Sequence, residues 1–308
     1  MSNALQAAGR PGWTLVWNDE FEGDAVDRSK WDFDLGNGFY DYRVHEWIAG
    51  WGNEELQYYT GEPENVRVAD SCLFIRAVKA PLHGCGYTSA RLKTKARDGR
   101  VLFAKLYGRV EFRARVPWGK GLWPALWMLP VDDKYGGWAA SGEIDLMEIV
   151  GEQPHEVLNS LHFGSAFPRR SLITTTHALG QSSVSDWHCY AVEWEPGEIR
   201  FYVDEQQTCS YRHWWSCSKL QDGQGVEAAA AAELNPWPAP FDQPFYLLMN
   251  VAVGGNFPGH PNAQTVFPAE LVVDWVRVYD KVGGYGPAAP RGEGVMPWEP
   301  GHVSERRL

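Results

Sequence analysis

The sequence SGEIDLMEIVG, near the middle of the chain, places three carboxylates, Glu143, Asp145 and Glu148, among long apolar residues. Acidic and apolar residues alternate over its first positions, which is typical of a β-strand with two different faces. Side chains of a strand point to opposite faces every second residue, so Glu143 and Asp145 share one face. Strict alternation would turn Glu148 into the apolar layer, where an unpaired charge is costly. One extra residue at Leu146 or Met147, a β-bulge, returns all three acids to one face, and we therefore predict a bulged strand.

Three acids on one strand face suit several kinds of site. Glycoside hydrolysis needs two carboxyl groups, about 5 to 5.5 Å apart when one attacks the sugar and about 6.5 to 9.5 Å apart when it activates water. Two long glutamates brought closer by a bulge favour the smaller gap, with Glu143 as nucleophile and Glu148 as acid/base. Asp145 between them would hydrogen-bond the nucleophile and keep the pKa values of the pair apart. A solvated acidic face or a calcium site has the same pattern, so the spacing alone leaves these alternatives open.

Further segments between Trp13 and Lys281 add to the acidic strand. In chain order they are WTLVWNDEFEG, WGNEELQYYT, YTSARLKTK, YGRVEFRARVPWGKGLWPALWML, LHFG, WHCYAVEWEPGEIRFYVD, FYLLMNVAVGGNFPG and VVDWVRVYD. Together with SGEIDLMEIVG, they resemble glycoside hydrolase family 16 in its bulged, laminarinase-like form. This resemblance implies an all-β fold, a β-sandwich of jelly-roll type with two curved antiparallel sheets and a concave substrate cleft.

The resemblance also implies residues that bind a sugar chain. They are Asn53, Arg91, Trp123, Trp127, His162 and Phe257. The planar fork of Arg91 suits paired sugar oxygens, and the two tryptophans lie on one face of an extended segment, where rings can stack on sugars. Phe257 stands where the family more usually has tryptophan. Without the resemblance, Asn53 is a turn-former, Arg91 a solvated strand residue, His162 a structural residue and the tryptophans core.

A structural calcium ion is a further implication of the resemblance, on the side away from the cleft. Its ligands would be Glu22, the carbonyl group of Gly61 and Asp274. From the sequence alone, Glu22 is a solvated loop acid. No cofactor is required for catalysis, because the chain carries neither a nucleotide-binding fingerprint nor an HExxH zinc motif.

Composition narrows the classes of partner. The net charge of −11 argues against nucleic acid, whose binding demands a basic surface. It also makes sulfated polysaccharides less suitable substrates. The chain has 16 Trp and 13 Tyr, and most of these rings should be core or sheet-face residues, whereas a minority on an open face can stack on an uncharged sugar chain. Together with the resemblance, which implies a β-glucan substrate, this leads us to expect a neutral β-glucan polysaccharide or oligosaccharide as the partner, and we expect the protein to be a monomer.

The strand pattern predicts one catalytic domain, for which 308 residues suffice. We assign residues 1–11 to a flexible lead-in or tag, 12–281 to a single β-sandwich and 282–308 to an irregular tail. Residues 206–243 interrupt the strand rhythm as a long loop insertion that includes a helix-prone alanine run. The polar stretch that ends at Gly38 is also predicted to be a loop.

Two local patterns lead to further expectations. In YGRVEFRARVP, apolar residues alternate with charged ones, so the face carrying Arg109 and Glu111 should be solvated. The five cysteines lack a CxxC motif, and Cys209 and Cys217 could close a loop disulfide. An odd count leaves the redox compartment open.

No apolar run is long enough to span a membrane. The first twelve residues, MSNALQAAGRPG, lack the basic start and apolar stretch of a signal peptide. Because an enzyme that degrades a polymer acts outside the cell, we still expect a secreted or periplasmic protein.

The sequence therefore favours a retaining, endo-acting hydrolase of laminarin-like β-1,3-glucan. One alternative is a non-catalytic β-glucan-binding protein on the same scaffold, which would be expected to lack one or more of the three acids. Another is a related hydrolase of mixed-linkage glucan or agar-type galactan. The extra residue between the acids favours the β-1,3 class over the mixed-linkage class, but galactanases can carry the same bulge.

Overall fold

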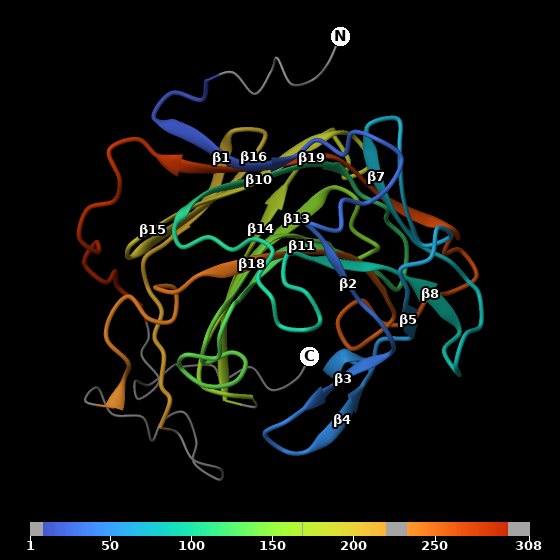
Figure 1. Ribbon diagram of the computed structural model, residues 1–308, viewed down its shortest axis with the longest axis horizontal. Coiled ribbons are helices and arrows are strands. Elements are labelled where there is room, and N and C mark those ends of the chain that lie inside the picture. The colour runs from blue at the N-terminus through green and yellow to red at the C-terminus, as the bar shows by residue number, and fades with distance from the viewer. Residues whose placement is uncertain (1–8, 168, 220–232, 295–308) are drawn as a thin grey trace.

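The computed structural model describes residues 9–167, 169–219 and 233–294. These residues form two large antiparallel sheets packed face to face (Figure 1), with β1, β10 and β19 in one layer and β11 and β18 in the other. The β-sandwich predicted from the sequence is confirmed. Among the described residues, no helix is both long enough and apolar enough to cross a membrane.

The first sheet has eight strands. In the order of their pairing they are β17 (Gln206–Tyr211), β16 (Glu198–Val203), β15 (His188–Glu195), β10 (Gly108–Arg115), β19 (Ala269–Lys281), β7 (Cys72–Ala77) and β6 (Val66–Ala69), while β1 (Trp13–Asp19) pairs with β19. The long β19 connects the sheet because it pairs with β10, with β1 and, at its start, with β7.

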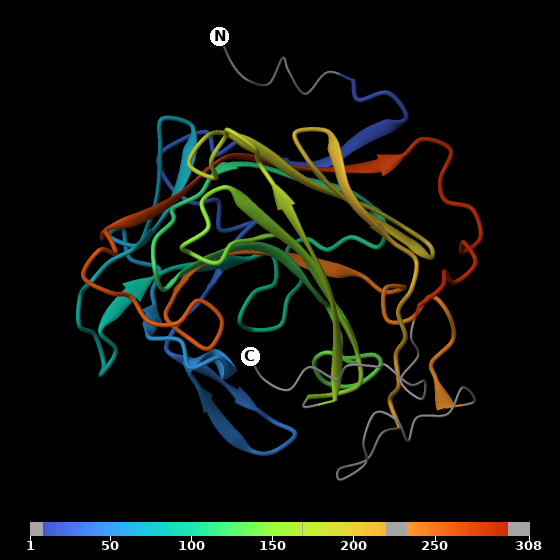
Figure 2. The same ribbon diagram turned by 180° about the vertical axis from the view of Figure 1, so that it is seen from behind.

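The second sheet has seven strands and carries the acids. Its order is β14 (Arg170–Ala178), β13 (Glu156–Gly164), β12 (Glu143–Glu148), β11 (Leu122–Pro130), β18 (Phe245–Val253), β9 (Arg91–Lys93) and β2 (Asp32–Asp34). Its long strands β13 and β14 bend strongly along their length (Figure 2). β2 corrects the prediction of a continuous loop up to Gly38, since three residues of that stretch pair with β9.

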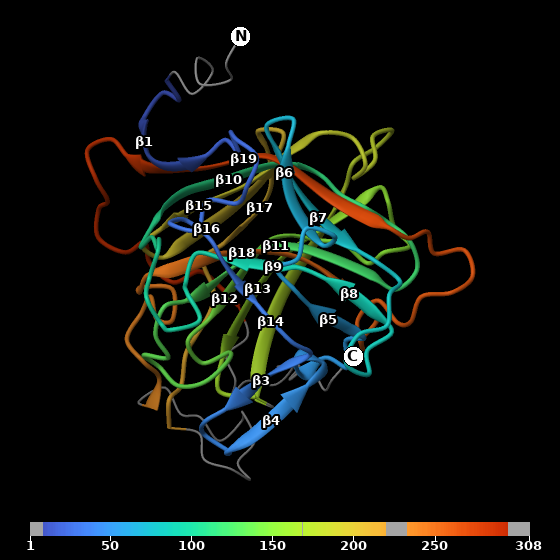
Figure 3. The same cartoon turned by 45° about the vertical axis from the view of Figure 1, so that its right-hand side comes forward.

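Two small sheets and a short helix lie beside the sandwich. They are the antiparallel pair β3 (Gly38–Asp41) and β4 (Glu46–Ala49), the parallel pair β5 (Gln57–Tyr59) and β8 (Tyr87–Ser89), and the 3₁₀ helix η2 (Gly50–Gly52). The β3–β4 hairpin projects from the body of the sandwich (Figure 3).

The predicted β-bulge is present in β12. On the β11 side, Leu126 pairs with Met147 and Trp127 pairs with Asp145, so Leu146 has no partner of its own. Both Leu146 and Met147 are fully buried. The extra residue thus keeps two apolar side chains in the core and turns Glu148 back to the face of Glu143. We call this face of the seven-stranded sheet, opposite to the core, the acid-bearing face.

The core lies between the two sheets. β18 is apolar almost throughout because it is central, with β11 on one side and β9 on the other, and from Leu247 to Val253 every residue is buried. The exception in its sequence is Asn250, a buried amide on the acid-bearing face. Trp214 and Trp215, from the predicted insertion, are also fully buried and belong to the core.

The structure corrects the prediction that one face of β10 is solvated. Arg109 and Glu111 are each only 1% exposed. Arg109 Nε donates to Glu111 Oε1 at 2.5 Å, and the same guanidinium reaches Glu205 at 3.0 Å. Arg10 Nη2 lies 2.6 Å from Glu111. The alternating pattern identified a polar face correctly, but Arg10 and the β16–β17 turn cover it.

Segments near the ends of the domain differ from the predicted boundaries. Arg10, assigned to the flexible lead-in, is fixed against the sheet by these ion pairs. The strand rhythm continues through β17, so the insertion begins after Tyr211. The alanine run of the insertion and much of the predicted lead-in and tail lie outside the described residues. Cys209 and Cys217 are free thiols, as are the other three cysteines, so the loop disulfide is not formed.

Candidate active site

Strand β12 places the three acids in a row. Glu143 lies opposite His162 of β13, Asp145 opposite Ser160, and Glu148 opposite Ala125 of β11. The Asp145 side chain is 2% exposed and that of Glu143 is 13% exposed. The row is therefore shielded from water at its centre and more open at its first member.

Glu143 and Asp145 share His162 as a neighbour. His162 Nε2 lies 3.3 Å from Asp145 Oδ2 and 3.8 Å from Glu143 Oε1. Arg170 Nη1 lies 3.2 Å from His162 Nδ1, and because a guanidinium can only donate, Nδ1 accepts. The proton of a neutral imidazole is then on Nε2, facing the acids. The indole Nε1 of Trp138 also donates to Glu143.

Glu148 is held by two different donors. Trp123 Nε1 donates to its Oε1 at 2.9 Å, and Ser160 Oγ donates to its Oε2 at 3.3 Å. The ring of Trp123 also lies 5.3 Å from that of Phe257, centroid to centroid. The two ends of the row thus have separate polar surroundings, as two carboxyl groups with different roles require.

The row of acids holds protons. Burial, the charge of Asp145 and that of Glu148 raise the pKa of Glu143 to about 8, although His162 and the Trp138 bond oppose the change. Burial and the charge of Glu148 raise the pKa of Asp145 well above its usual range. Like charges at close range in a buried site cannot all ionise. At neutral pH the three acids therefore carry fewer than three negative charges.

Arg91 lies on the same face, on β9, which β11 and β18 separate from the strand of the acids. Its Nε donates to Asp34 Oδ2 at 2.7 Å, and its guanidinium carbon lies 3.7 Å from the centre of the Trp51 ring. Arg91 pairs in register with Asn250 of β18, whose Oδ1 accepts from Trp127 Nε1 at 2.7 Å. Arg91 and Trp127 are thus fixed in place by neighbours before any sugar binds.

Asn53 lies between this region and Phe257. Its Nδ2 donates to Glu55 Oε1 at 3.1 Å, and its carbonyl oxygen accepts from the backbone of Asn256 at 2.8 Å. Burial raises the pKa of Glu55. Asn53 therefore contacts the loop that carries Phe257, and the six predicted binding residues all lie on or beside the acid-bearing face.

The comparison with known proteins agrees with this geometry. The sequence pattern of the family described as "Glycosyl hydrolases family 16" matches residues 53–214. The chain belongs to this family. The resemblance inferred from the motifs is confirmed.

Relatives of known structure or sequence support the assignment. The chain is 42% identical over 281 residues to "Glucan endo-1,3-beta-glucosidase A1" of Niallia circulans, covering 87% of this chain but 38% of that protein. It is 41% identical to "Beta-glucanase" of Rhodothermus marinus, covering 87% and 86% of the two chains. The X-ray structure of the laminarinase from Rhodothermus marinus matches with a TM-score of 0.70 and 40% identity, over 87% of this chain and 97% of that one.

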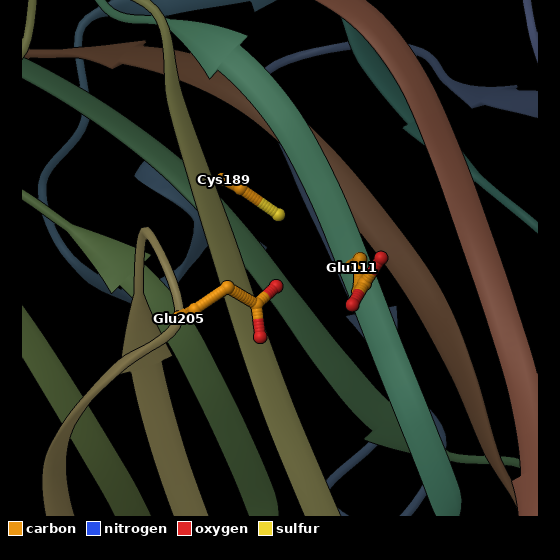
Figure 4. A group of neighbouring side chains, drawn as sticks. All are labelled: Glu111, Cys189 and Glu205. Carbon is orange, nitrogen blue, oxygen red and sulfur yellow. The ribbon is translucent and has the colours of Figure 1, made fainter. Parts of the chain in front are cut away.

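Two groups of side chains in the described residues have the donor types of a metal site. In the family 16 acid row, Glu143, Asp145 and His162 have donor atoms within 4.8 Å of one another. The Arg170 guanidinium beside His162 disfavours a second cation there. The other group is Glu111, Cys189 and Glu205 (Figure 4), in which Glu205 reaches from the β16–β17 turn toward the other two. Arg10 and Arg109 already neutralise these carboxylates, so neither group indicates a metal.

The predicted calcium ligands do not form a third such group. The carboxylate of Asp274 is paired with Arg113 on β10. Glu22 is exposed in the loop after β1, and Gly61 follows β5. A calcium ion at Asp274 would require Arg113 to give up this pair, and the calcium site stays a prediction.

Sequence reasoning did not single out several side chains that contact the acids. Trp138 and Ser160 donate to Glu143 and Glu148, and Arg170 orients His162. Ser160 lies two residues before His162, so the period of a strand indicated its face. Trp138 and Arg170 had no comparable signal, because Trp138 comes from a loop and Arg170 from the first position of a neighbouring strand.

Proposed function

We propose that this protein is an endo-acting hydrolase of β-1,3-glucan that retains the configuration of the cleaved bond. The single observation that supports this most is the bulge in β12, which gathers Glu143, Asp145 and Glu148 onto one face with separate donors for the two glutamates. The names of the family 16 relatives support the substrate class.

In the first step, the Glu143 carboxylate attacks the anomeric carbon while Glu148 gives its proton to the departing glycosidic oxygen. The bond to the leaving sugar breaks as an ester bond to Glu143 forms. The Nε1–H of Trp138 and the Nε2–H of His162 stabilise negative charge on Glu143 before the attack.

In the second step, Glu148, now a carboxylate, takes a proton from water as the oxygen of that water attacks the same carbon. The ester bond breaks and Glu143 leaves as a carboxylate. Glu148 is protonated again, so the cycle closes without a cofactor.

Asp145 holds a proton next to the nucleophile Glu143. His162 Nε2 lies 3.8 Å from Glu143 and 3.3 Å from Asp145, and two buried carboxyl groups at such close range do not both ionise, so one of them keeps a proton. For attack, this proton must be on Asp145, which then donates to Glu143 and leaves it ionised. The more buried position of Asp145 suits the neutral form.

The test is the release of reducing ends from laminarin, with product sizes followed over time. An endo-acting enzyme shortens the polymer early and gives a range of oligosaccharides. Binding without any release would favour the non-catalytic glucan-binding alternative. Faster cleavage of lichenan, agarose or porphyran in the same panel would favour a related hydrolase with another substrate.

Export from the cell, the monomeric state and the structural calcium ion stay predictions. Size-exclusion chromatography with light scattering tests the monomeric state. Thermal unfolding with and without EDTA tests the calcium ion, since loss of a structural ion would lower the midpoint temperature of unfolding.

A further inference from the structure

The β3–β4 hairpin, residues 38–49, exposes an unusual number of aromatic rings. Five of the fourteen large hydrophobic side chains that are exposed in the described part of the chain lie in these twelve residues: Phe39, Tyr40, Tyr42, Val44 and Trp47. Tyr42 is 78% exposed and Trp47 is 53% exposed. Exposed apolar side chains gathered on one short element mark a binding surface more often than singly scattered ones do.

Three of the rings share one face of the hairpin. Tyr40 pairs in register with Trp47, so their side chains lie on the same side. Tyr42, two residues after Tyr40, lies on that side too, and the two tyrosine rings meet edge to face at 4.8 Å. Phe39 pairs with Ile48 on the other side. We call the face made by Tyr40, Tyr42 and Trp47 the aromatic face.

The hairpin is fixed at its base and near its tip. At the base, Gly50 N donates to Asn37 O at 2.7 Å, and the rings of Phe39 and Trp51 lie 6.2 Å apart. Near the tip, the guanidinium of Arg43 packs directly against Gly137. A Cβ atom added to Gly137 would lie only 1.0 Å from Arg43 Nη1, so this contact requires glycine. Arg43 is itself held by Asp41 at 2.7 Å. The aromatic face is therefore presented on a supported element.

Both anchors lead to the acid-bearing face. At the base, Trp51 stacks against Arg91 at 3.7 Å. Near the tip, Gly137 immediately precedes Trp138, whose indole donates to Glu143. The hairpin thus adjoins the active site from two directions, and a polymer leaving that site can continue onto it.

The indole Nε1 of Trp51 is buried and has no hydrogen-bond partner within the described ranges. Trp51 lies against Phe39, on the side of the hairpin opposite to the aromatic face, so this unpaired group belongs to the base of the hairpin and not to that face.

We propose that the aromatic face binds a further stretch of the same β-glucan chain, beyond the sugars held at the three acids. Stacking of sugar rings on aromatic rings requires no charge, and the charged pair Asp41–Arg43 of the hairpin is already matched internally. The hairpin then favours long chains over short ones. This inference rests on the proposed function, because it takes the substrate to be a β-glucan.

The first test compares substrates of two lengths. In Tyr42→Ala/Trp47→Ala, the ratio of kcat/KM for laminarin to kcat/KM for laminaritetraose should fall about tenfold, mainly through KM for laminarin, since each ring contact contributes a modest free energy. Trp187→Ala is the matched control, an exposed tryptophan that lies against Arg113 and Arg115. Its ratio should equal that of the parent. An unchanged ratio in the double variant would overturn the proposal.

The second test measures binding without turnover. The Glu143→Gln protein should migrate more slowly in a native gel that contains laminarin, and the Tyr42→Ala/Trp47→Ala changes in that background should remove most of the retardation. Equal retardation of both proteins would also overturn the proposal. A parent protein that forms dimers only when Tyr42 and Trp47 are present would assign the surface to a second copy instead. If the parent cleaves no β-glucan, the proposed function fails. The native gel still measures whether Tyr42 and Trp47 contribute to laminarin binding, so the two failures can be told apart.

Discussion

Two clusters of carboxylates lie on the two sheets, and they differ in what neutralises them. On the eight-stranded sheet, the guanidinium groups of Arg10 and Arg109 lie among Glu111 and Glu205. On the seven-stranded sheet, Glu143, Asp145 and Glu148 face each other, with uncharged donors from Trp138, Trp123 and Ser160 close by.

The pKa values of Glu205 in the first cluster and of Glu143 in the second move in opposite directions. The hydrogen bond from Arg10 lowers the pKa of Glu205. Burial and neighbouring acids raise the pKa of Glu143. A cluster in which guanidinium groups balance the carboxylates stabilises the fold. A cluster in which carboxyl groups lie close together without such balance has raised pKa values and can exchange protons with a substrate. The surroundings, and not the number of acids, distinguish structural from catalytic carboxylates.

The largest expected effect is on catalysis by the acid row. Glu143→Gln should reduce kcat for laminarin by about three powers of ten or more, because the nucleophile is lost and groups that act as a unit fail together. Circular dichroism should show an unchanged fold. Glu205→Gln, the same chemical change in the other cluster, is the control and should keep kcat within about twofold of the parent. Similar losses in the two variants would remove the distinction between the clusters.

The second prediction concerns the stability of the charge-balanced cluster. Arg109→Met leaves Glu111 buried with fewer partners, and breaking a buried pair in this way costs about 3 to 5 kcal/mol of unfolding free energy. Urea unfolding measures it. Arg100→Ala is the control, because its pair with Asp98 is exposed and should leave the free energy of unfolding nearly unchanged. A loss in Arg109→Met no larger than in the control would contradict the structural role.

The third prediction uses the raised pKa of Glu143. Between the unfolded value of about 4.3 and the folded value of about 8, the folded chain binds a proton that the unfolded chain has released. This group therefore stabilises the fold at low pH, and its contribution is lost as the pH rises to about 8. The decline is at most about 1.4 kcal/mol per pH unit for one proton. The free energy of unfolding of Glu143→Gln, measured with urea from pH 5 to about 8, should decline less steeply than that of the parent. Parallel declines would show that the acid row does not hold this proton.

The smallest expected effect has the opposite sign. Glu205 has a lowered pKa, so its contribution to stability is present above the unfolded value and is lost as the pH falls through the folded one. Its side chain is 54% exposed, so solvent weakens the effect. Glu205→Gln should be slightly less stable than the parent at neutral pH and equal to it in acid. A difference that grows in acid would contradict the pairing with Arg10.

The same comparison shows which features a sequence can predict. The β12 bulge was predictable because only one register keeps Leu146 and Met147 in the core and Glu148 out of it. For Arg109 and Glu111, alternation indicated the correct face but not its covering, because Arg10 and Glu205 are distant in sequence. Trp138 was missed because it comes from a loop, and loops carry no period that says where their side chains point.

The most direct test of the acid row is to trap its intermediate. A 2-fluoro β-1,3-linked glucoside with a good leaving group forms the ester quickly and hydrolyses slowly, so mass spectrometry of the intact protein and of its peptides can locate the sugar. The account predicts one sugar adduct on Glu143, absent from Glu143→Gln. An adduct on Glu148, or rapid turnover of the parent with inverted products and no adduct, would contradict it.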